Sequence, residues 1–349
     1  MEKYEEESRS DLRNLFIQIP CLNEEKTLPL VIKTLPAQIS GIDNIYLLVI
    51  NDGSSDNTYK VASDIGVDFI INNKKTMGLA QSFKRGLETC LYLGADIIIN
   101  IDGDNQYKGE DIRKLVQKIV EDKCDLVIGC RNIIQQKEFN FIKKMFHLLG
   151  NRLVNLFCKS SITDITSGLR GITSAAAVNL HIKNEFSYTI EMIIQSLSFG
   201  MVIGKIDIMT NKKTRKSRLY KSNFSFILSQ AKIIIHTSIF YYPTRFFSIL
   251  SAIFCFLSLI LATRIMYFLY LYPDLPSFKT GSGILLVIFI LLAALCLIVV
   301  LLSFIFAGLR ITVDDIRHRV RNIELNKKIK PSGFKIVIAK HFGKWKGFA

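Results

Sequence analysis

The stretch "INIDGDNQY", Ile99–Tyr107, runs from apolar residues directly into Asp102 and Asp104. The apolar part is typical of a buried strand, and two carboxylates at its end repel each other and lose hydration. A cation or several hydrogen-bond donors must compensate. Asp102, Asp104 and Gln106 occupy alternate positions, so in an extended segment their oxygens project to one side and can hold one hard divalent ion. The alternative is a β-turn with solvent-exposed aspartates, which the apolar run disfavours.

Other short β-rich runs lie on both sides of this stretch, with helical patterns between them. These runs are mostly apolar on both faces, as in a parallel or mixed sheet covered by helices. The alternation of strands and helices predicts an α/β fold with ligands at the carboxyl ends of the strands. The predicted strands are "NLFIQIP", "NIYLLVIND", "VDFIIN", "ADIIINID" and "CDLVIG".

Two more polar motifs follow predicted strands. In "VINDGSSDNT", Asp52 precedes a tight turn into a helix, which would leave its carboxylate free to accept hydrogen bonds from a base or a ribose. In "IPCLNEEKTL", Asn23 and Glu24 are either a helix cap or ribose ligands.

The second half of the chain contains two long apolar segments, Phe246–Leu271 and Ile284–Leu309. Each is near the ~20 residues that cross a bilayer. The net charge of +15 is confined to their flanks, because residues 205–232 carry +7 and residues 310–349 carry +8. This distribution indicates a membrane protein with two spans rather than a nucleic-acid binder, and places both the N-terminal head and the C-terminal tail in the cytoplasm.

Residues 223–243 are apolar with a polar stripe and end in aromatic residues. We interpret them as an interfacial helix, the alternative being the last helix of the soluble domain. The seven cysteines form no CxxC pair and are expected to be reduced. The small number of spanning helices favours a homo-oligomer.

Seven motifs in this order resemble glycosyltransferase family 2, and more narrowly the polyprenyl-phosphate glycosyltransferases such as the dolichol-phosphate mannose synthase group. They are "IPCLNEE", "VINDGSSDNT", "NNKKTMGLAQSFKRGL", "INIDGDNQY", "IGCRN", "DITSGLRGI" and "FSYTIEMIIQSLSFG". The resemblance implies a GT-A (Rossmann-like) catalytic domain at residues 15–222. It follows an N-terminal tail at 1–14 and precedes the interfacial helix, the spans at 244–309 and a basic tail at 310–349.

The resemblance also implies an enzyme that moves a sugar from a nucleotide-diphosphate sugar (UDP or GDP) to a polyprenyl phosphate, with inversion. Mg²⁺ or Mn²⁺ would be held by Asp102, Asp104 and Gln106, and Asp104 and Arg131 would be catalytic. Nucleotide-sugar contacts would come from Pro20, Asn23, Glu24, Asp52, Gly78, Asp102, Ser167 and Gly168, with Asp164 in the same loop. Acceptor-phosphate contacts would come from Arg131, Lys143 or Lys144, and Arg218.

The chain departs from the family pattern at two places. Tyr107 stands where the family usually has histidine, and "KKTRKSRLYKS" lacks the glycine of a later basic element. Because a lipid monophosphate is already an anion at neutral pH, no strong base is required, and we expect Glu191 to have a positioning role. The alternatives are a family 2 enzyme with another membrane acceptor and a non-enzymatic membrane adaptor. A processive synthase is disfavoured because the Gln-x-x-Arg-Trp signature is missing.

Overall fold

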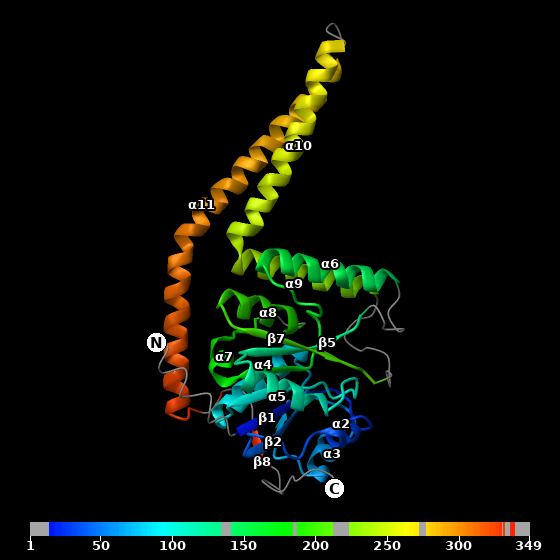
Figure 1. Ribbon diagram of the computed structural model, residues 1–349, viewed down its shortest axis with the longest axis vertical. Helices are drawn as coiled ribbons and strands as arrows, with labels where there is room; N and C mark the ends of the chain where they lie inside the picture. The colour runs from blue at the N-terminus through cyan, green and yellow to red at the C-terminus, as the bar shows by residue number, and fades with distance from the viewer. Residues whose placement is uncertain are drawn as a thin grey trace. The chain divides into compact units, whose positions relative to one another are not determined.

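The computed structural model describes residues 14–133, 141–183, 187–211, 223–271, 277–329, 331 and 336–338. The chain forms two compact units, whose elements are drawn in Figure 1. One unit contains the residues up to Ile234 and those from His318 onward, and the other is Ile235–Arg317.

A mixed sheet forms the centre of the first unit, in the order β7-β5-β6-β4-β1-β2-β3-β8. Strands β4, β1, β2 and β3 are parallel, and β6 is antiparallel to its neighbours β4 and β5. This arrangement confirms the predicted α/β class. The strands are β1 (Asn14–Cys21), β2 (Asn44–Asn51), β3 (Phe69–Asn72), β4 (Ile97–Asn100), β5 (Leu126–Arg131), β6 (Arg170–Thr173), β7 (Ile203–Ile208) and β8 (Ile336–Ile338).

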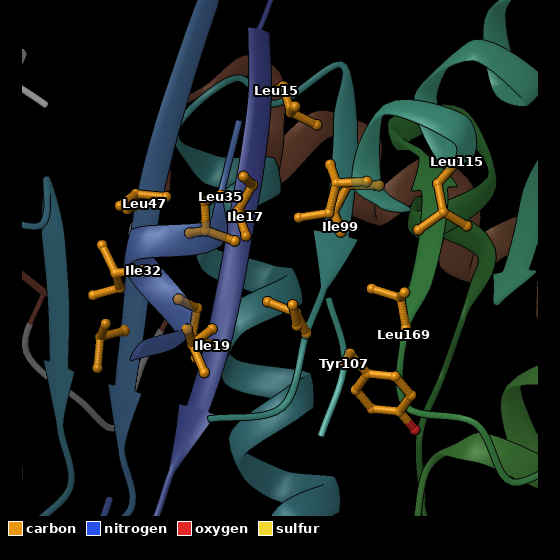
Figure 2. Packing of buried hydrophobic residues seen from close by; sticks show 14 of the residues in the cluster. Leu15, Ile17, Ile19, Ile32, Leu35, Leu47, Ile99, Tyr107, Leu115 and Leu169 are labelled. Carbon is orange, nitrogen blue, oxygen red and sulfur yellow. The ribbon is translucent and has the colours of Figure 1, made fainter. Parts of the chain in front are cut away.

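Both faces of the central strands are buried, as their apolar sequences predict. Leu15, Ile17 and Ile19 alternate along β1 and belong to one cluster with Ile99 and Leu115 (Figure 2). On the opposite face Phe16 of β1 packs against the rings of Tyr46 and Phe69, with centroids 4.8 and 6.0 Å away. Burial of a large apolar side chain contributes about 1.5–3 kcal/mol, so these layers fix the strand register.

Helices cover the sheet where the sequence shows a helical period. In α5, Ile112, Leu115, Val116 and Ile119 are buried, an i, i+3, i+4, i+7 stripe that packs on β5 and β6. Helix α2 ends before the extended Leu35, as expected for a residue that precedes proline. The remaining bounds are α2 (Leu28–Thr34), α3 (Thr58–Ile65), α4 (Leu79–Tyr92), α5 (Asp111–Glu121), α7 (Ser174–Asn179) and α8 (Thr189–Ser198).

Two longer helices, α6 (Phe141–Cys158) and α9 (Asn223–Tyr241), lie alongside each other in Figure 1. They come near each other at Gly150, where an added Cβ would make an ordinary contact of 3.5 Å with Cδ1 of Ile234. The predicted interfacial segment at 223–243 is helical from Asn223 to Tyr241. Its place at a membrane surface stays a prediction.

The second unit contains α10 (Pro243–Leu271) and most of α11 (Ser277–Asn326). Both helices are long and apolar enough to cross a membrane, with mean hydropathy of 2.4 and 3.7 in their most apolar stretches. This agrees with the two predicted spans.

The C-terminal segment, which we predicted as a basic tail from residue 310 onward, contains regular structure. Helix α11 continues to Asn326, and Ile336–Ile338 form β8, which pairs antiparallel with β3. His318 and Arg321 of α11 lie within hydrogen-bond distance of Asn179 and of the carbonyl oxygen of Leu180. A three-residue strand gives almost no sequence signal, and its pairing depends on an unpaired sheet edge that the sequence does not display.

Candidate active site

The loop after β4 lies against the end of β1. A Cβ at Gly103 would be 2.7 Å from Sγ of Cys21 and 3.3 Å from the carbonyl oxygen of Pro20, so this close approach requires glycine. Residues 103–105 form a turn rather than the extended segment we predicted. The backbone N–H of Gln106 donates to Oδ1 of Asp104 at 3.0 Å and closes this turn. The aspartates are nevertheless half-buried rather than solvent-exposed.

Asp102 holds the least compensated carboxylate of this loop. Its Oδ1 is enclosed and has no hydrogen-bond partner, and an added Cβ at Gly168 would lie 2.3 Å from its Oδ2. Burial and the neighbouring charge of Asp104 raise the pKa of Asp102 to about 7, against the opposing effect of Arg131 and Arg170. A carboxylate in this position can bind a hard cation, which would supply the missing contact.

Two further enclosed oxygens without a hydrogen-bond partner lie in the loop after β4 and in the loop that carries Gly168. They are Oδ1 of Asn105 and Oγ of Ser167. Buried polar atoms in native proteins are normally hydrogen-bonded, so such atoms point to a ligand or an ion. In the part of the chain that the structure describes, no group of three or more His, Cys, Asp or Glu side chains is placed to hold a metal. A cation here would therefore bind two carboxylates and complete its shell with other oxygens.

Arg131, at the end of β5, is buried and bound to Asp164. Its Nε lies 2.7 Å from Oδ2 and its Nη2 3.0 Å from Oδ1 of that carboxylate, and Nη2 also donates to Oγ1 of Thr166. Nε2 of His147, on α6, lies 3.2 Å from Oδ1 of Asp164. Burial alone would raise the pKa of Asp164, but Arg131 and the hydrogen bond from His147 hold it well below its ordinary value.

Arg170 holds the same loop from the other side. Its guanidinium is fully buried and donates to the carbonyl oxygens of Ser167, Thr189 and Ile165 at 2.8, 2.6 and 2.9 Å. Burial lowers the pKa of Arg170. The loop from Ile165 to Gly168 is thus fixed between two buried arginines.

Gly168 is positioned through its backbone. Its N–H donates to Oη of Tyr107 at 2.7 Å, and its carbonyl oxygen accepts from Nδ2 of Asn100 at 2.9 Å. Burial raises the pKa of Tyr107 to about 12, so its hydroxyl stays protonated at neutral pH. Tyr188, whose ring stacks on that of Phe83 at 3.7 Å, also receives a hydrogen bond from Asn100.

The loops after β1 and β2 are joined at Asn23. Its N–H donates to Oγ of Ser54, its Oδ1 accepts from the N–H of Ser55, and its φ of 55° lies in the left-handed region. The N–H of Glu24 donates to Oγ1 of Thr58. The structure therefore gives Asn23 and Glu24 a structural role beside the predicted ribose contacts.

Asp52 is not free, contrary to our expectation. Its Oδ1 accepts hydrogen bonds from Asn73 and from the N–H of Met77, and its Oδ2 accepts one from the N–H of Gly78, all at 2.9 Å. These bonds hold the loop between β3 and α4. A carboxylate has about four acceptor positions, so a nucleoside contact of Asp52 stays a prediction.

Some predicted residues lie elsewhere or outside the described part. Lys144 is half-buried on α6. The side chain of Lys143 and the whole of Arg218 lie outside the described residues. Glu191 is buried in α8, and both its carboxylate oxygens lie 3.2 Å from the N–H of Lys183.

Comparison with known proteins identifies the family. The family model of glycosyl transferase family 2 matches residues 16–178. The chain is 32% identical over 181 residues to the UDP-N-acetylglucosamine–dolichyl-phosphate N-acetylglucosaminyltransferase of Methanococcus voltae, covering 46% of this chain and 70% of the relative. The chain belongs to glycosyl transferase family 2.

A further relative and a solved structure bear on the narrower resemblance and on the fold of this family 2 glycosyltransferase. It is 26% identical over 201 residues to the undecaprenyl-phosphate mannosyltransferase of Micrococcus luteus, covering 54% of this chain and 80% of the relative. The similarity to polyprenyl-phosphate glycosyltransferases is thereby confirmed. Glucosyl-3-phosphoglycerate synthase of Mycobacterium tuberculosis, solved with Mn²⁺, UDP-glucose and phosphoglyceric acid, aligns with a TM-score of 0.53 at 17% identity, over 68% of this chain and 82% of that one. The GT-A fold is confirmed.

The residues that support the site of this glycosyltransferase were missed by sequence reasoning. They are His147, Arg170, Asn100 and Tyr188. Asn100 carried a signal, because it interrupts the apolar run of β4. His147 and Asn151 carried a weaker one, since two polar residues four apart lie on one face of a helix.

Proposed function

We propose that the chain is a membrane-anchored, inverting glycosyltransferase that moves a sugar from a UDP-sugar to a polyprenyl phosphate. The relatives named above, one of which uses a UDP-sugar and both of which use polyprenyl phosphates, support the substrates. One structural observation carries the proposal. The enclosed, unpartnered Oδ1 of Asp102 lies beside Asp104 at the end of β4, where the donor's diphosphate would bind.

The residues present fit a divalent cation. Asp102 and Asp104 supply two carboxylates, which are the hard oxygen ligands that Mg²⁺ or Mn²⁺ prefers. The raised pKa of Asp102 reflects its burial beside the charge of Asp104, which a bound cation would offset. Asp102 and Asp104 would hold the ion, with Gln106 following in the same loop. When bound, the ion neutralises charge on the departing diphosphate. The solved Mn²⁺ and UDP complexes of the structural neighbour are compatible with this assignment.

The reaction needs no strong base in this site. The second pKa of a lipid monophosphate is about 6, so its oxygen is already an anion at neutral pH. That oxygen attacks the anomeric carbon from the side opposite the diphosphate, whose bond to the sugar breaks, and the configuration inverts. The two-sided contact of Glu191 with the N–H of Lys183 supports a positioning role for this residue.

Buried positive charge attracts the acceptor. Nε and Nη2 of Arg131 are already engaged by Asp164 and Thr166, so Arg131 and Arg170 would act on the acceptor through their positive field. Lys143 or Lys144 and Arg218 would add further positive charge. The field draws a second anion, the acceptor phosphate, toward the donor.

The anchor and its orientation are part of the proposal. α10 and α11 would cross the bilayer, with the catalytic unit and the C-terminal segment in the cytoplasm, as the positive flanks indicate. A homo-oligomer stays a prediction.

The test is synthesis of a glycolipid by the purified full chain. Polyprenyl phosphate is supplied with UDP-sugars and GDP-sugars in turn, with Mn²⁺, with Mg²⁺ and with a chelator. We expect a UDP-sugar-dependent product that requires metal, and no product from polyprenol, which lacks the phosphate. Asp104→Ala serves as the inactive control. Transfer that is insensitive to chelation would overturn the metal assignment, and nucleotide-sugar binding without any transfer would favour an adaptor.

A further inference from the structure

Helix α6 has an apolar face that the first unit leaves exposed. Seven large apolar side chains that the structure describes on this helix are at least one-third exposed, among them Phe141 at 81% and Leu156 at 56%. The seven are Phe141, Met145, Phe146, Leu148, Leu149, Leu153 and Leu156. Contiguous apolar surface of this kind on a soluble unit marks an interaction site.

The opposite face of α6 is buried against the rest of the first unit. His147, Asn151, Val154 and Cys158 are buried at i, i+4, i+7 and i+11. Nε2 of His147 lies 2.9 Å from Oγ1 of Thr166 and 3.2 Å from Oδ1 of Asp164. Packing against the unit therefore leaves no reason for the apolar residues on the outer face.

We infer that the outer face of α6 inserts into the anionic surface of the bilayer. Its sequence "FIKKMFHLLGNRLVNLFC" contains two lysines and one arginine and no acidic residue. Basic residues beside a broad apolar face are typical of helices that lie in the headgroup layer.

The chain connection favours a lipid surface over a second protein. α6 packs against α9 near Ile234, and Ile234 lies nine residues before Pro243, where the first candidate span begins. At 1.5 Å per helical residue this path is roughly 14 Å long. If α10 crosses a bilayer, the contact point on α6 cannot be far from its surface.

Docking of α6 has a direct consequence for the site. A helix with its side chains is about 10–12 Å across, and Asp164 and Arg131 lie on the inner side of α6. Insertion of the outer face would hold this ion pair about one helix diameter from the lipid phosphates. The inference does not rest on the proposed transfer reaction, since a helix can insert whatever the enzyme transfers.

The experiment uses the full chain in vesicles and a local fluorescent probe. The chain has a single tryptophan, Trp345, so Trp345→Phe gives a silent background. Leu149→Trp places a probe on the outer face. Leu30→Trp in α2 is the matched control, because both leucines are 47% exposed and α2 lies at the other end of the unit from α6 (Figure 1). Vesicles of phosphatidylcholine and phosphatidylglycerol carry brominated acyl chains, which quench tryptophan at short range.

We expect brominated chains to reduce the Leu149→Trp emission at least twofold and to leave that of Leu30→Trp nearly unchanged. Adding Lys144→Gln and Arg152→Gln should weaken the quenching, most clearly as the anionic lipid fraction falls. Equal emission of the two probes in brominated vesicles would overturn the inference, and so would crosslinking between copies through the thiol of Leu149→Cys in place of quenching. No donor, acceptor or metal is present, so this result and the glycolipid assay fail independently.

Discussion

Arg131 and Asp164 form a two-bond ion pair in which Nε lies 2.7 Å from Oδ2 and Nη2 lies 3.0 Å from Oδ1. Both side chains are buried, at 8% and 0% exposure. The arginine that the family resemblance assigns to the acceptor is therefore also a structural partner of the loop that carries Gly168.

Removing either partner of this pair should destabilise the protein. An unpaired buried charge typically costs about 3–5 kcal/mol, so Arg131→Ala and Asp164→Ala should each lower the thermal midpoint clearly. The double variant should lose less than the sum of the two. Thermal unfolding of the four proteins in one detergent measures this coupling, and strictly additive losses would contradict it.

The same arginine should affect the acceptor more than the donor. Arg131→Lys keeps the charge but cannot form two parallel bonds to the carboxylate. We expect its KM for polyprenyl phosphate to rise by more than its KM for the UDP-sugar. A rise confined to the donor would assign Arg131 to the nucleotide side.

Metal binding should depend on pH through Asp102. Burial and Asp104 raise its pKa to about 7, and a metal must displace the proton. Below pH 7 the apparent Kd for Mn²⁺ should rise by up to about tenfold per pH unit, whereas above pH 8 it should level off. Binding measured calorimetrically at pH 6, 7 and 8 checks this. An affinity that is independent of pH would mean that Asp102 does not ligate the ion.

The raised pKa also has a consequence for stability without metal. A folded-state pKa above the ordinary value means that the folded protein loses stability as pH rises from about 4 to about 7, where Asp102 becomes charged. Asp102→Asn removes that charge, so at pH 8 it should stabilise the metal-free protein by roughly 1–3 kcal/mol while abolishing the stabilisation by Mn²⁺. A variant that is less stable than the parent in chelator would contradict this expectation.

Gly168→Ala should damage the site without unfolding the protein. The added Cβ would fall 2.3 Å from Oδ2 of Asp102, so the carboxylate must move out of place. We expect at least tenfold lower transfer and weaker metal binding, with a thermal midpoint close to that of the parent. Gly150→Ala is the control, because its Cβ would meet neighbours only at 3.5 Å or more.

Asp52→Asn tests the loop between β3 and α4. An amide cannot accept at both positions, so the N–H of Met77 or of Gly78 loses its partner at a cost of about 1–3 kcal/mol. KM for the UDP-sugar should rise more than KM for the acceptor. Asp64→Asn, at an exposed position of α3, should leave both unchanged.

The sequence predicted β1 to β5 in their order of appearance because each has a local pattern of apolar residues, whereas the short or partly polar β6, β7 and β8 were not predicted. It also placed Asp102 and Asp104 at the end of a buried strand, since charged residues that follow an apolar run can be recognised from the sequence alone. The pairing of Arg131 with Asp164, and the three carbonyl contacts of Arg170, could not be predicted. They depend on β6 lying antiparallel between β4 and β5, a tertiary choice that no single segment encodes.

The return of the chain to β8 affects how the protein can be made. Within the described residues, β3 receives its outer partner from Ile336–Ile338, which the ribosome delivers after both apolar helices. Until β8 is synthesised, the outer edge of β3 is unpaired and can pair with any other extended chain. A fragment that ends at Ile234 lacks β8, so the outer edge of β3 stays unpaired. This fragment should precipitate where the whole chain does not.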